Sequence, residues 1–263
     1  MRYADSTWEE IAAIPRGRLI GVLPIGATEA HGPHLAVGAD VTIAEAMAGA
    51  ALPALAAAGW EPRVLPALAY TPAPFARAFP GTLAIRPRTL VETVVDLADA
   101  LADHGAAALA IANSHLDPEH LAALETAVAR IVAAGRLRVA FPNLVRRRFA
   151  ERLGEEFRSG ACHAGRFETS IVLAARPAEV RAPAARELPP NPRSLVEAMR
   201  AGHADFASAG GPRAYFGDPA AASREEGDQS VRILGDILAE ATLAALAAPA
   251  PGGDRPAADG GST

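Results

Sequence analysis

The stretch LIGVLPIG at residues 19–26 is short, rich in Val, Ile and Leu, and ends in a glycine. An apolar run of this length that stops at a turn residue is typical of a strand buried on both faces of a parallel sheet. Similar stretches at 63–70, 106–113 and 136–143 predict three further strands. We therefore expect a sheet of buried, mostly parallel strands built around residues 19–26.

Helical patterns fill the intervals between these strands. An Ala-rich pattern follows Asp40, which we predict as its N-cap, and a break is expected near Pro53. Further helices are expected over about 88–104 and 118–134, each followed by a glycine. Alternating strands and helices with short connections predict a three-layer α/β/α sandwich with a mostly parallel central sheet.

The second half of the chain is less regular. The stretch 146–157 has a helical pattern, 166–175 fits either a helix or a strand, and 228–248 predicts a terminal helix. Because 263 residues lie near the upper limit for one hydrophobic core, we expect one domain over 1–247, with two small domains as the alternative. The tail 248–263 should be disordered.

Composition excludes several classes of function. The net charge of -5 and the pI of about 5.8 give no basic field, so nucleic acid and anionic membrane surfaces are not expected partners. All 25 basic residues are arginine, which excludes Schiff-base, PLP and P-loop lysine chemistry. Cys162 is the only cysteine, which excludes an intrachain disulfide and a Cys-rich zinc module. Any metal must therefore be held by histidines and carboxylates.

The cellular compartment is predicted from two absences. The first 18 residues contain acidic side chains and no apolar stretch of signal-peptide length, and no uncharged run has membrane-spanning character. We expect a cytoplasmic protein.

Two groups of histidines and carboxylates follow directly after predicted strands, where ligands bind in open α/β sheets. Glu29 and His31 are two residues apart, so in an extended segment both side chains point to one side, and Asp40 could add a third ligand or bridge two ions. His115 and Asp117 repeat this spacing after the strand at 106–113. The repetition favours a metal site over isolated structural histidines.

The stretch HAGRFETS contains a third pair, His163 and Glu168, five residues apart, which does not by itself identify a metal or catalytic site. Glu168 is a candidate catalytic residue that anchors His163, or else it pairs with Arg166. The remaining histidines receive structural interpretations: His104, His120 and His203 fall on predicted helices and are expected to be surface or capping residues. His34 is interpreted as a structural partner of the site, and it is also kept as a candidate substrate contact.

The motifs LPIGATEAHGPHLAVGADVTIAEA (23–46), FPGT (79–82), HAGRFETS (163–170) and GDPAAASREEG (217–227) resemble those of the creatininase (creatinine amidohydrolase) family, in the same order and at similar separations. The resemblance extends from about residue 5 to residue 246. It implies an α/β/α sandwich with two divalent metal ions, usually zinc, manganese or iron, in amidohydrolases that assemble as homo-oligomers, namely hexamers.

The resemblance also implies roles for individual residues. Glu29 and His115 would hold one ion, His31 and Asp117 the other, and Asp40 would bridge both. A water between the ions would be the nucleophile, since two cations lower its pKa and polarise the substrate carbonyl. His163 matches the family's active-site histidine and would carry a proton to the leaving nitrogen.

Two positions depart from the family pattern. Asp117 stands where many relatives carry glutamate, so this carboxylate is one methylene shorter. Arg166 follows His-Ala-Gly, where the family often has an acidic residue. Arg166 is therefore a candidate substrate contact, and it favours a substrate with a carboxylate, phosphate or polyhydroxyl group over creatinine.

The sequence thus predicts a metal-dependent hydrolase that cleaves a non-peptide C–N bond, in a cyclic amide or formamide, within a small polar metabolite. One alternative is ring opening or isomerisation of a keto-sugar or cyclitol at the same metals. Another is a metal-binding subunit without catalytic activity.

Overall fold

A computed structural model of the chain describes residues 1–160 and 163–248. Four parallel strands pair in the order β2-β1-β3-β4. Their bounds are Leu19–Ile25 for β1, Glu61–Val64 for β2, Ala108–Asn113 for β3 and Arg138–Ala140 for β4. The parallel sheet is as predicted, although β2 and β4 are shorter than the apolar stretches that predicted them.

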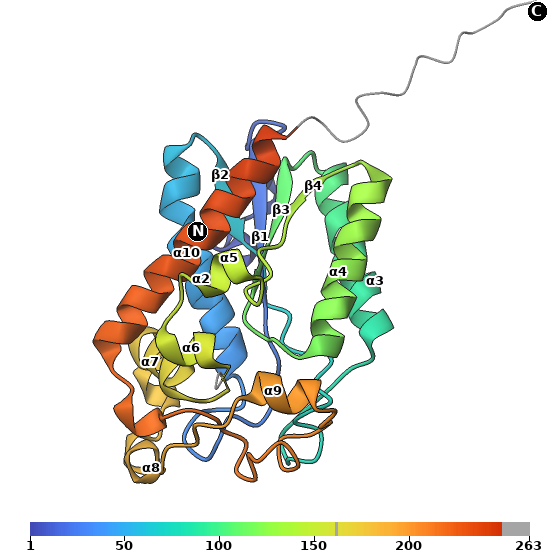
Figure 1. Ribbon diagram of the computed structural model, residues 1–263. Helices are drawn as coiled ribbons and strands as arrows, with labels where there is room; N and C mark the ends of the chain where they lie inside the picture. Colours follow the sequence, from blue (N-terminus) through green and yellow to red (C-terminus); the bar gives the residue numbers. More distant parts are fainter. Residues whose placement is uncertain (161–162, 249–263) are drawn as a thin grey trace, which may run out of the picture.

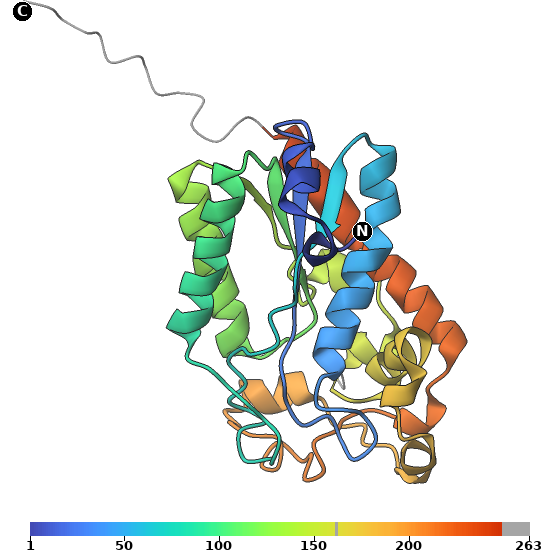
Figure 2. The same ribbon diagram turned by 180° about the vertical axis from the view of Figure 1, so that it is seen from behind.

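Helices cover both faces of this sheet (Figures 1 and 2). Because side chains alternate along a strand, Leu23 and Ile25 of β1 pack with α3 (Pro87–Asp103) and α4 (Pro118–Ala134). Ile20 and Val22 point the other way, into a core shared with α2 (Ala39–Ala57), α7 (Arg166–Ala175) and α10 (Arg224–Ala247). The predicted three-layer sandwich is confirmed, and 166–175 is a helix.

Helix α2 corrects two predictions. Gly38, not Asp40, is its N-cap, and Asp40 lies in the first turn. Pro53 does not end the helix, which continues to Ala57. Among the described residues α2 is the one helix long and apolar enough to cross a membrane, but half of that stretch is buried and it packs against α10 and β1. Its composition is that of a core helix.

Shorter helices gather mainly beyond the carboxyl end of the sheet, where α6, α7 and α9 lie together with long loops (Figure 1). In place of one predicted helix at 146–157 the structure has two short helices. The first ends at Ala150, and Gly154 is the N-cap of the second. The tail predicted to be disordered, 248–263, lies outside the described residues apart from Ala248. The remaining elements are η1 (Tyr3–Asp5), α1 (Trp8–Ala12), α5 (Arg147–Ala150), α6 (Glu155–Ser159), η2 (Pro177–Glu179), α8 (Ala182–Glu187), α9 (Leu195–Arg200) and η3 (Pro219–Ala221).

Candidate metal and catalytic site

The candidate site lies where the strand order reverses. From β1 the chain passes to β2 on one side of it and later to β3 on the other, so the loops after β1 and β3 diverge and leave a crevice between them. The loop after β1 carries Glu29 and His31, and the loop after β3 carries His115. All three side chains are buried and close together, as their positions after strands predicted.

Asp40 reaches the same place because the end of β1 lies against the start of α2. A Cβ atom at Gly26 would lie 2.5 Å from the backbone nitrogen of Val41, so only glycine permits this approach. The Ser114 hydroxyl donates to the Asp40 carbonyl at 2.6 Å, and the Ala27 N–H donates to Asp40 Oδ2 at 3.3 Å. The end of β1, the loop after β3 and the start of α2 together hold the Asp40 carboxylate in position.

The Asp40 carboxylate lies between two histidines. Its Oδ1 is 3.2 Å from His31 Nε2, and its Oδ2 is 3.1 Å from His115 Nδ1. Glu29 Oε1 lies 3.5 Å from the same His115 nitrogen. One Asp40 oxygen thus faces each imidazole, so Asp40 is the carboxylate that the two histidines share.

Glu168 completes the group around His31. Helix α7 carries it, and its Oε2 lies 3.7 Å from His31 Nε2. The same oxygen accepts the backbone N–H of Ala164 at 2.6 Å, and Ala164 adopts a left-handed conformation with φ of 50°. Strain of this kind at a non-glycine residue persists where surrounding contacts impose it, and it often marks functional sites.

Ligand atoms within 4.8 Å of one another therefore form two overlapping triads with Asp40 in common. One triad is Glu29, Asp40 and His115, and the other is His31, Asp40 and Glu168. Glu29, His31 and His163 make a third possible combination.

Asp117 does not join His31, contrary to the prediction. It is the N-cap of α4, where Oδ1 accepts the Glu119 N–H at 2.8 Å and Oδ2 accepts the Phe75 N–H at 3.5 Å. Among the described residues it belongs to none of the groups able to hold an ion. Glu168, predicted as a catalytic residue, takes the place beside His31.

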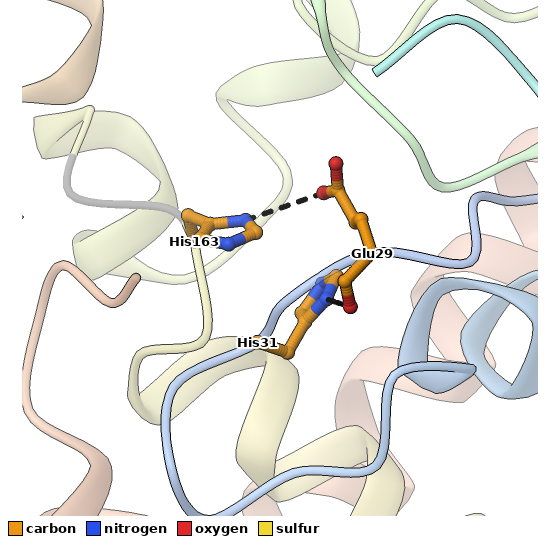
Figure 3. A group of neighbouring side chains, drawn as sticks. All are labelled: Glu29, His31 and His163. Atoms are coloured by element: carbon orange, nitrogen blue, oxygen red, sulfur yellow. Dashed lines mark hydrogen bonds and ion pairs between the residues drawn. The ribbon is translucent and has the colours of Figure 1, made fainter. Parts of the chain in front are cut away.

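The outer nitrogen of each histidine in the site is held by a backbone carbonyl. His31 Nδ1 lies 3.2 Å from the Glu29 carbonyl, His115 Nε2 lies 2.8 Å from the Pro72 carbonyl, and His163 Nε2 lies 2.9 Å from the Ala30 carbonyl. Figure 3 shows His163 directed at the Glu29 carboxylate and His31 beside the Glu29 carbonyl. Since a carbonyl only accepts, these nitrogens carry protons. In a neutral ring the other nitrogen, which faces the carboxylates, then carries the free lone pair. This is the tautomer that a metal ligand needs.

The buried charges compensate one another through protons. Burial alone would lower the pKa of His31, but Asp40, Glu168 and Glu29 outweigh it and raise the pKa to about 10. The same competition raises the pKa of His115 well above its ordinary value, chiefly through Glu29 and Asp40. Burial raises the pKa of Glu168 to about 8. Near neutral pH His31, His115 and Glu168 are therefore protonated, and these protons occupy positions at which the geometry would suit metal cations.

His163 differs from the other two histidines. Burial and the neighbouring His31 lower its pKa to about 4, so it is neutral near pH 7. Its ring stacks on Phe206 with centroids 4.1 Å apart, and its Nδ1 lies 3.8 Å from Glu29 Oε1 (Figure 3). A neutral imidazole with a free Nδ1 can accept a proton there.

A cavity of about 620 Å³ opens onto these residues. Asp117, His163 and Glu168 line it, whereas Arg166 and His34 do not. Arg166 Nε pairs with Glu226 Oε2 at 3.3 Å, and His34 Nε2 bonds Thr169 Oγ1 at 2.9 Å. The structure therefore brings neither candidate substrate contact to the cavity.

The sequence interpretation was wrong for His120. It is buried, its Nε2 lies 2.7 Å from Asn113 Oδ1, and the Asn113 amide donates to the His115 carbonyl at 2.7 Å. His120 thus supports the loop that carries His115. Its position four residues before Leu124, on the apolar stripe of α4, was the signal that could have identified it. His104 and His203 are exposed, and His104 caps α3 as expected.

Comparison with known proteins gives consistent matches. The family model "Creatininase: Creatinine amidohydrolase" matches residues 4–242. The mycofactocin precursor peptide peptidase of Mycobacterium tuberculosis is 32% identical over 213 residues, 78% of this chain and 77% of that protein. The creatinine amidohydrolase of Pseudomonas putida is 32% identical over 119 residues, 43% of this chain and 44% of that protein. The solved structure "Creatininase Mn" has a TM-score of 0.68 and 25% identity, covering 94% of this chain and 98% of that one.

The geometry predicts opposite results for two carboxylate variants. Glu168→Gln should lose about one bound ion per chain, because it removes a charged oxygen beside His31. Asp117→Asn should keep the wild-type metal content, because its oxygens accept backbone N–H groups. Elemental analysis of both variants purified without chelator measures this. Metal loss in Asp117→Asn alone would instead make Asp117 the ligand that acts with His31.

Proposed function

The chain belongs to the creatininase family, and from that premise we propose that it hydrolyses a non-peptide C–N bond, a cyclic amide or formamide, in a small polar substrate. It is a metal-dependent hydrolase of this family, and candidate ligands are present in two triads. The observation that carries the proposal is the set of histidines whose outer nitrogens donate to backbone carbonyls while their inner nitrogens face buried carboxylates.

This donor set fits divalent ions. It consists of imidazole nitrogens and carboxylate oxygens, which suit zinc and manganese as well as iron. Glu29 Oε2 is buried without a hydrogen-bond partner, so this oxygen has unused coordinating capacity. We assign one ion to Glu29, Asp40 and His115, and the other to His31, Asp40 and Glu168.

When bound, such ions would supply an activated water and polarise the substrate carbonyl. His163 would accept a proton at Nδ1 as the water oxygen adds to the carbonyl carbon. It would return that proton to the nitrogen as the C–N bond breaks. Its Nε2–H bond to the Ala30 carbonyl keeps Nδ1 available, and the stack on Phe206 holds the ring plane.

A second candidate is hydrolysis of an amide bond in a short peptide. The peptidase of M. tuberculosis aligns over more of this chain than the creatinine amidohydrolase of P. putida does. The apolar part of the cavity, which includes Phe75, Leu116 and Phe157, would accept a peptide side chain.

A keto-sugar or cyclitol substrate and a non-catalytic role are both less well supported than amide hydrolysis. Arg166 and the altered loop His115-Leu116-Asp117 motivated the keto-sugar or cyclitol, and Arg166 pairs with Glu226 away from the cavity. A non-catalytic role would not require a neutral His163 directed at a cavity. Homo-oligomeric assembly, with the hexamer implied by the family resemblance, and a cytoplasmic location stay predictions.

A substrate panel tests the proposed reaction. Lactams, formamides, short peptides and keto-cyclitols are incubated with the protein, and released acid or amine is measured. We expect turnover of a lactam or formamide that stops after chelation and returns with Mn²⁺ or Zn²⁺. Turnover confined to peptides would favour the second candidate, and turnover confined to keto-cyclitols would contradict both.

Replacing His163 separates proton transfer from metal binding. On the best substrate of the panel, His163→Gln should lower kcat by roughly 10²- to 10⁴-fold, the usual contribution of a positioned acid or base. Metal content should stay at the wild-type value. A parallel loss of metal would instead make His163 a ligand, within the combination of Glu29, His31 and His163.

A further inference from the structure

One wall of the cavity is built from the end of α6 and from α9. The Leu195 N–H donates to the Gly160 carbonyl at 2.9 Å, which joins the two helices. A Cβ atom at Gly160 would lie 2.5 Å from Ser194 Oγ, so the contact is close. Side chains of both helices therefore face one common space, and Phe157, Leu195 and Met199 make part of it apolar.

Two arginines line this wall. Arg158 lies in the last turn of α6, and Arg200 is the last residue of α9. Both are exposed, and neither forms an ion pair with a carboxylate in the described part of the chain. Arg166, which the sequence suggested for substrate binding, is by contrast engaged with Glu226. The cationic groups at the cavity thus come from elements that the family motifs do not include.

The lining of the cavity therefore carries charged side chains of both signs. Glu29, Asp40, Asp117 and Glu168 come from the loops after β1 and β3 and from α2 and α7. Arg158 and Arg200 come from α6 and α9, where they outnumber the one acidic residue of this wall, Glu197. An elongated ligand with one anionic group gains from placing that group among the guanidiniums, which match a carboxylate in geometry and charge. The apolar side chains of the same lining suit an apolar ligand body.

We propose that Arg158 and Arg200 form an anion subsite, and that the substrate is an amide whose apolar body carries a carboxylate. The inference rests on the proposed function for its catalytic end only. The carboxylate binds at the arginines, and this orients the scissile amide toward His163. The specificity-determining residues therefore lie on α6 and α9.

Two matched probes test the subsite. N-formyl-L-leucine has the amide, the apolar body and the carboxylate, while N-formyl-L-leucinamide lacks only the negative charge. Affinities for the metal-loaded protein are measured by titration calorimetry for wild type, Arg158→Gln, Arg200→Gln and the double variant. Arg232→Gln, on the exposed face of α10 and outside the cavity, is the matched control. Formate release is measured separately, so failure of hydrolysis and failure of binding are distinguishable.

We expect wild type to prefer the acid over the amide, and the double variant to bind the acid at least about five-fold more weakly, as the loss of two exposed ion pairs would give. Amide binding and the Arg232→Gln control should be unchanged. If wild type turns the acid over, its KM should rise in the double variant while kcat stays constant. Equal loss for both probes, no loss, or no binding of the acid to wild type would overturn the proposal.

Discussion

The site depends on the convergence of three carboxylates, Glu29, Asp40 and Glu168, in a place almost without access to water. Burying uncompensated charge is costly, and only nearby positive charge offsets the cost. In this protein two imidazoles lie within 3.7 Å of these oxygens. The geometry therefore demands cations, and in their absence the histidines must supply protons.

The fold supplies the frame for this convergence. The reversal of strand order leaves a crevice between the loops after β1 and β3, into which both loops direct their ligands, and Gly26 lets α2 begin against the end of β1. Backbone carbonyls then hold the outer nitrogens of the histidines, so their inner nitrogens point at the carboxylates. The left-handed turn at Ala164 brings α7 and Glu168 from the far part of the chain.

The sequence predicted well what depends on local periodicity. Buried strands and their following loops were placed closely enough to bring Glu29, His31 and His115 together. It failed where long-range packing decides. The spacing of His115 and Asp117 matched that of Glu29 and His31, yet Asp117 satisfies its carboxylate at the start of α4. Spacing within one loop carries no information about Glu168, whose place is set by the packing of α7.

Proton release on metal binding tests the central claim most directly. Since the raised pKa of His31, about 10, and that of His115 keep both protonated at pH 7, a bound cation must displace these protons. Calorimetric titration with Mn²⁺ or Zn²⁺ in buffers of different ionisation enthalpy should show release of at least about two protons per chain at full loading, and affinity that rises with pH. Binding without proton release, or affinity independent of pH between 6 and 8, would contradict the account.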